Sequence, residues 1–118
     1  MLQSVNLKRK LTVYNLMDLQ EEIRMVRSLD TYVTLKKTPD KITDLNLLER
    51  ALASIEAATA ATGREYVFKE IQQISIGSFI DLVPKDYNVN TKVNWVIGTY
   101  DKSYFERRMK ELKEESYQ

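Results

Sequence analysis

Carboxylate and amine side chains gather where a run of strand-forming residues ends. Asp81 and Asp86 flank Pro84, and Lys85 is adjacent to Asp86. Two carboxylates and a lysine at a strand end could hold Mg²⁺, which can activate water or polarise a phosphate. No third acidic residue at a matching spacing supports such a site. A Mg²⁺-dependent carboxylate enzyme around Asp81 is therefore the second alternative function.

The residue counts exclude most other catalytic chemistry. The chain has 0 His and 0 Cys, so Ser-His and Cys-His nucleophilic catalysis and ordinary zinc sites cannot be built. Its 3 glycines, at positions 63, 77 and 98, cannot form a glycine-rich phosphate loop. We therefore expect no cofactor and no metal, and we favour a protein that is not an enzyme.

A basic, aromatic cluster near the N-terminus offers a different chemistry. Residues 5–13 alternate apolar and polar side chains, which predicts a half-buried strand. The cations and the aromatic residue of this patch are Lys8, Arg9, Lys10 and Tyr14. The cations of such a strand could contact phosphates, and its tyrosine could stack on a base. Lys36-Lys37 and Arg107-Arg108 could extend this basic patch. The net charge of only +1 does not favour a dedicated nucleic-acid binder, so this is the first alternative function.

An apolar stripe near the C-terminus indicates a contact surface. Ser103 and Glu106 form a capping box that begins a helix over 104–116, and most of that helix is charged. Its stripe is narrow, so it either docks on its own sheet or pairs with another chain. A glycine within a strand can also mark close approach of a partner. The expected partner-binding residues are Tyr104, Phe105, Met109, Leu112, Gly77 and Phe79.

Helical and strand periodicities order the rest of the chain. Amphipathic spacing predicts helices over 17–29 and 43–62, the second ending at Gly63. Residues 31–36 are β-branched and aromatic; a strand is favoured there, with continuation of the preceding helix as the alternative. Alternation from Val93 to Gly98 predicts a further strand.

The stretch Gln72–Val83, QQISIGSFIDLV, admits two readings. If one strand runs straight through, Ile74, Ile76, Ile80 and Leu82 share an inward face, and Gly77 is a bend or bulge. If Gly77-Ser78 is a two-residue hairpin turn, both faces become mixed. The continuous strand separates apolar from polar side chains better, so we favour it.

Together these patterns predict an α+β fold and a single domain over residues 1–118. The expected architecture is a mostly antiparallel sheet of three or four strands packed by two or three helices, in the order β-α-(β)-α-β-β-α. The expected function is a non-enzymatic protein-interaction module, an adaptor, inhibitor or assembly factor, whose partners include a second copy of itself. The N-terminus lacks the apolar segment of a signal peptide and no apolar run approaches about 20 residues. We therefore expect a cytoplasmic protein that does not associate with a membrane.

Overall fold

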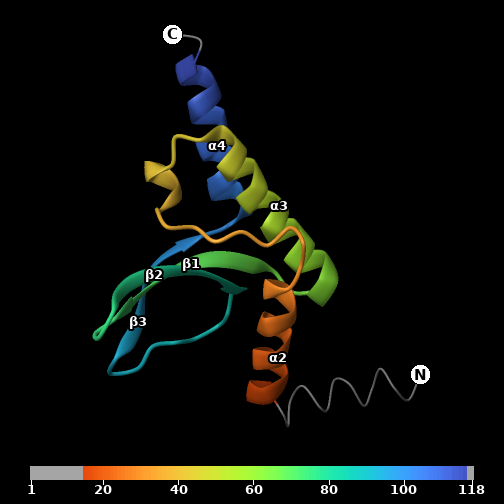
Figure 1. Ribbon diagram of the computed structural model, residues 1–118, viewed down its shortest axis with the longest axis vertical. Coiled ribbons are helices and arrows are strands. Elements are labelled where there is room, and N and C mark those ends of the chain that lie inside the picture. The colour runs from red at the N-terminus through yellow and green to blue at the C-terminus, as the bar shows by residue number, and fades with distance from the viewer. Residues whose placement is uncertain (1–14, 117–118) are drawn as a thin grey trace, which may run out of the picture.

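The computed structural model describes residues 15–116, which form an α+β fold with an antiparallel sheet, as the sequence predicts (Figure 1). Its elements are α2 (Asn15–Arg27), the short 3-10 helix η1 (Pro39–Lys41), α3 (Leu45–Thr62), β1 (Tyr66–Gln73), β2 (Gly77–Pro84), β3 (Asn94–Tyr100) and α4 (Lys102–Ser116). The described part begins with a helix, so it matches the predicted element order only in part. The predicted strand over 5–13 lies outside the described residues.

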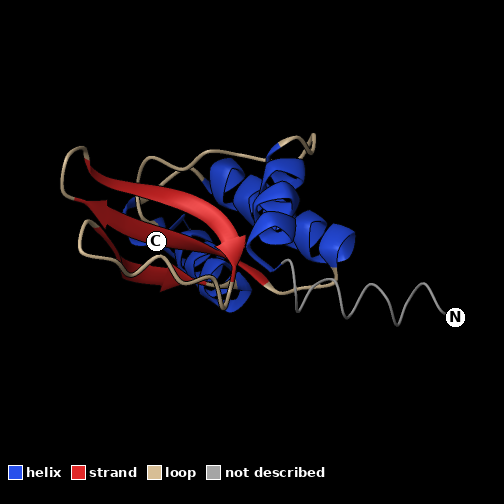
Figure 2. Ribbon diagram, turned by 90° about the horizontal axis from the view of Figure 1, so that it is seen from below, coloured by secondary structure: helices blue, strands red, loops and turns tan. Residues whose placement is uncertain are grey.

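The sheet has the strand order β2-β1-β3, and both neighbours of β1 run antiparallel to it. One face packs on the helices, with Phe68 of β1 and Phe105 of α4 at the centre of the core. Their ring centroids lie 5.5 Å apart. Figure 2 shows the strands as one layer beside the helices, and in Figure 1 the end of the sheet near the β1–β2 turn extends beyond them.

Helix α3 ends where Gly63 predicts, and it begins at Leu45, two residues after the predicted start. Asp44 precedes it and accepts a hydrogen bond from the Asn46 amide, and Gly63 ends it with φ 76°, in the left-handed region. Helix α4 begins earlier than predicted, because Asp101 replaces Ser103 as its cap. The Asp101 carboxylate accepts the Tyr104 amide at 3.0 Å, and this hydrogen bond lowers the pKa of Asp101.

The favoured strand over 31–36 is wrong, and so is the helical alternative. Helix α2 ends at Arg27, turns follow over residues 28–31, and residues 32–35 then have no strand partner. Ser54 of α3 holds it instead: its hydroxyl donates to the Thr31 carbonyl at 2.5 Å and accepts from the Val33 amide at 3.0 Å. Val33 and Leu35 are buried against the core, so these apolar side chains fill a helix surface rather than a sheet.

The continuous strand through Gly77 is also wrong. Residues 74–76 form a turn, and Gln73 pairs with Gly77 across the resulting hairpin. Gly77 has φ 88°, a backbone conformation that glycine adopts without steric cost, and it closes this turn. The turn begins at Ile74, three residues before the Gly77-Ser78 turn of the alternative reading. Ile74 and Ile76 are 65% and 70% exposed, which is the opposite of the predicted inward face.

The Ser54 bridge gives a stability prediction. Ser54→Ala removes both hydrogen bonds and leaves the buried Val33 amide without a partner, so it should lower the free energy of unfolding by about 1–3 kcal/mol. Urea unfolding measures this. Ser75→Ala, in the exposed hairpin turn, is the control and should change stability by less than about 0.5 kcal/mol. Equal effects of the two substitutions would show that the bridge is not needed.

Candidate functional site

Four large apolar side chains are exposed together at the end of the sheet. Ile74 and Ile76 come from the β1–β2 turn, Val93 directly precedes β3, and Trp95 lies at the start of β3; we call these four the sheet-end patch. Their exposed fractions are 65%, 70%, 52% and 37%. The Ile74 amide donates to the Val93 carbonyl at 3.0 Å, and Gln72 pairs with Trp95, so the two segments are adjacent. Exposed apolar surface gathered in this way is typical of interaction sites, so this patch is a candidate site.

The start of β3 is held by polar side chains of the preceding loop. The Thr91 hydroxyl oxygen accepts from the Val93 and Asn94 amides, and the Asn90 side chain accepts from the Val96 amide at 3.0 Å. A bulge opposite Glu70 and Ile71 then leaves Ile97 outside the strand pairing. Ile97 is 48% exposed and Phe79 is 38% exposed, so apolar surface continues beyond the sheet-end patch.

The stripe on α4 packs inside the protein. Phe105 has no exposed surface, and Met109 and Leu112 pack against the core. Tyr104 lies edge-on to Tyr100, with 5.0 Å between ring centroids. A partner therefore cannot reach Phe105 in this structure, and Met109 and Leu112 serve first to dock α4. Of the predicted partner-binding residues, Gly77 and Phe79 lie on the hairpin that carries Ile74 and Ile76.

Asp81 is held in an ion pair. Its carboxylate accepts from the Arg27 guanidinium at 2.6 Å and from the Leu82 amide at 3.0 Å. Within residues 15–116 no three acidic side chains are grouped so that they could hold one metal ion. The geometry therefore gives Asp81 a structural role, joining α2 to β2.

Two further polar clusters, which the sequence analysis did not single out, also join elements. The buried Tyr66 hydroxyl donates to Glu22 at 2.6 Å, and Glu22 also accepts from Arg64 at 3.1 Å. Burial and the neighbouring Glu22 carboxylate raise the pKa of Tyr66. On the sheet face turned away from α3, Lys69 is only 7% exposed and its ammonium donates to the Tyr87 carbonyl at 2.7 Å. This bond ties the β2–β3 connection to the sheet. A lysine between Phe68 and Glu70 carries no sequence signal of such burial.

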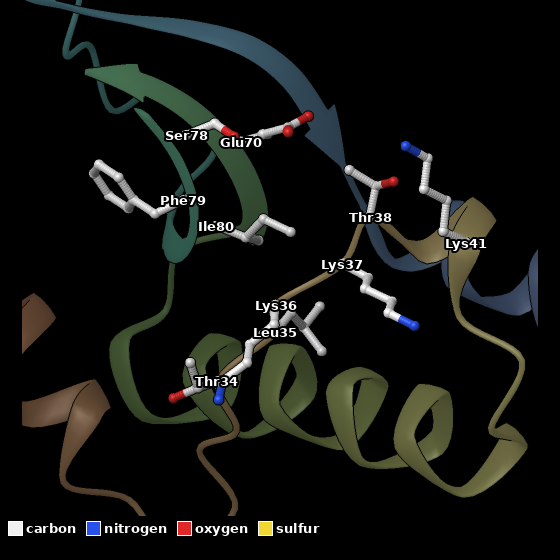
Figure 3. Close-up of a pocket in the computed structure, with 10 residues that line it drawn as sticks. All are labelled: Thr34, Leu35, Lys36, Lys37, Thr38, Lys41, Glu70, Ser78, Phe79 and Ile80. Carbon is white, nitrogen blue, oxygen red and sulfur yellow. The ribbon is translucent and has the colours of Figure 1, made fainter. Parts of the chain in front are cut away.

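A groove runs between the chain segment before α3 and the outer strand β2. It has a volume of about 460 Å³, and we call it the lysine groove. Figure 3 shows its lining: Thr34, Leu35, Lys36, Lys37, Thr38 and Lys41 on one side, and Glu70, Ser78, Phe79 and Ile80 on the other. The basic residues Lys8, Arg9, Lys10 and Tyr14 lie outside the described residues, so the nucleic-acid alternative remains a prediction.

Comparison of the chain with protein-family models, curated proteins and solved structures found no match. In residues 15–116 no helix is both long and apolar enough to cross a membrane. The functional argument therefore rests on the surfaces described above.

The buried lysine gives a pH-dependent prediction. Burial lowers the pKa of Lys69, against the opposing effect of Asp86, whereas the pKa of a lysine in the unfolded chain is about 10.4. Between the lowered pKa and the ordinary value, the unfolded state binds more protons, so folding becomes more favourable as pH rises. The free energy of unfolding of the wild type, minus that of Lys69→Met, should therefore increase with pH in this window.

Urea unfolding from about pH 7 to about pH 10.5 measures that difference. Both chains contain the same tyrosines, whose titration cancels in the subtraction if the sites do not interact. A difference that falls with pH, or that stays constant, would contradict a depressed pKa at Lys69.

Proposed function

We propose that the protein is a non-enzymatic interaction module that associates with a second copy of itself through the sheet-end patch. The observation that carries the proposal is the exposure of Ile74, Ile76, Val93 and Trp95 at one end of the sheet. Apolar side chains on a surface gain free energy when a partner covers them. An adaptor, an inhibitor or an assembly factor would each need such a binding surface.

The chemistry of the patch favours a second copy as the occupant. A two-fold symmetric interface brings the same surface of two chains together, so a charge close to the symmetry axis meets a like charge. The four patch residues carry no charge, and such a pairing meets no repulsion from them. At Val96 the Asn90 side chain already accepts the backbone amide. The association is therefore expected to use side chains rather than pairing of two β3 edges.

Size-exclusion chromatography with light scattering on the full chain, over a range of concentrations, tests the proposal. The wild type should form a dimer, and Ile76→Ser should raise its dissociation constant by at least about tenfold, because the apolar side chain is lost from both copies. Met25→Ser is the matched control, since Met25 on α2 is also apolar and is 38% exposed. It should leave the dissociation constant unchanged within about twofold.

Two results would contradict the proposal. The wild type could remain a monomer at the highest concentration reached, or Met25→Ser could weaken the dimer as much as Ile76→Ser does. The second result would place the interface elsewhere on the protein.

A further inference from the structure

Strand β2 lies at the edge of the described sheet, and the register shows which of its backbone groups face outward. The Lys85 amide donates to the Glu65 carbonyl at 2.9 Å, so this pair is hydrogen-bonded across the hairpin. In an antiparallel pair of strands, residue pairs that are hydrogen-bonded to each other alternate with residue pairs that are not. The residues of β2 that turn their amide and carbonyl groups away from β1 are therefore Ser78, Ile80, Leu82 and Pro84.

The half of this edge near Pro84 is blocked. Pro84 has no amide hydrogen, and the Leu82 amide is already bonded to the Asp81 carboxylate, which Arg27 holds in place. Proline and charged side chains are common devices that prevent unwanted pairing at a sheet edge. Ser78 and Ile80 have no such protection, and within residues 15–116 their outward amides have no partner in the ladder.

The unprotected half of the edge lies in the lysine groove. Ser78 and Ile80 both line it, and Lys37 and Lys41 line it from the other side, on the chain segment before α3 (Figure 3). Within the described residues, neither lysine makes a salt bridge. The groove volume of about 460 Å³ is within the range of small-ligand sites. A free strand edge and unpaired positive charge thus occur in one place.

We propose that the lysine groove binds an extended acidic peptide of a partner protein, which adds to the edge of β2 at Ser78 and Ile80. The peptide backbone pairs with the outward amide and carbonyl groups, and its carboxylates face Lys37 and Lys41. Strand addition of this kind gains affinity from the main chain and specificity from side chains. The proposal does not depend on self-association, because the sheet-end patch consists of other residues.

Backbone chemistry favours a peptide over a nucleic acid in this groove. An exposed strand edge offers donors and acceptors in alternation, and a peptide backbone supplies both. A phosphodiester backbone supplies acceptors but no donor, so the outward carbonyls of Ser78 and Ile80 would stay unpaired. Glu70 also lines the groove and would repel a chain that is charged at every unit, whereas a peptide can place an uncharged residue beside it.

Charge also selects among peptides. The chain's own predicted strand over 5–13 carries Lys8, Arg9 and Lys10, which Lys37 and Lys41 would repel. An acidic segment meets the opposite charge. Because Glu70 is present as well, a sequence that alternates acidic and uncharged residues fits better than a uniformly acidic one.

The test uses the full chain and a fluorescent peptide of about eight residues that alternates Glu and Val, since alternate side chains of a strand share a face. Fluorescence anisotropy at low salt gives its dissociation constant. The peptide should bind at least about tenfold more tightly than its Lys-Val counterpart, because both groove lysines reverse the sign of their interaction. Added salt should weaken the binding. On binding, hydrogen exchange at the Ser78 and Ile80 amides should slow.

Changes on both partners separate strand addition from simple charge attraction. Two Glu-Val peptides, each methylated on every second backbone nitrogen and offset from each other by one residue, test the main-chain pairing without any change to the protein. One of the two should lose binding, because its methyl groups block the amides that pair with β2. Ser78→Pro removes one outward amide and should weaken binding by about tenfold, whereas Ser78→Ala should not. Lys37→Glu with Lys41→Glu should also weaken it by about tenfold, and Lys92→Glu with Lys110→Glu, both exposed and outside the groove, is the control with the same change in total charge. Ile76→Ser should leave peptide binding unchanged.

Several results would overturn the proposal. The Ser78 and Ile80 amides could already be protected from exchange in the free protein, which would mean that another segment occupies the edge. Both methylated peptides could bind as well as the parent, which would reduce the site to charge alone. An oligothymidylate could displace the peptide and bind equally well to Ser78→Pro, which would identify a phosphate-binding groove instead.

Discussion

The central strand β1 is buried on both faces over its first four residues, Tyr66 to Lys69. Tyr66 and Phe68 face the helices, and Val67 and Lys69 face the opposite side, where the chain after β2 crosses at Tyr87. The strand is also hydrogen-bonded to a neighbour along each edge. Its position therefore requires cover on two faces and two partner strands, and the remaining elements supply them.

That requirement leaves the other end of the sheet with less cover. Helix α4 directs Phe105 into the core beside Phe68, and the small side chains Ala51 and Ala58 of α3 are buried in the same core. Beyond Ile71, strand β1 is only half-buried, and the turn that follows it is exposed. The apolar residues there are left outside this small core, which is why the sheet end is the candidate binding surface.

Local signals predicted the elements whose boundaries depend on local chemistry. Gly63 acts within one turn of helix, so the sequence predicted the end of α3 to the residue, whereas the start lies at Leu45, two residues after the predicted one, because Asp44 is the N-cap. The hairpin could not be predicted in this way, because the register argument assumes that isoleucines face inward. At Ile74 and Ile76 that assumption fails. The alternation that favoured one strand was produced by apolar residues in a turn.

The candidate surfaces depended on tertiary structure more than on motifs. Phe105 had the sequence pattern of a contact residue, yet the fold places it in the core, since a narrow apolar stripe suits an internal or an external neighbour equally. The lysine groove has no motif, because Lys37 and Ser78 become neighbours only when the chain before α3 runs beside β2. Ser54 fixes that path by bonding the backbone on either side of Tyr32. A single buried hydroxyl on α3 thus helps to position the lysines across from the open edge of β2.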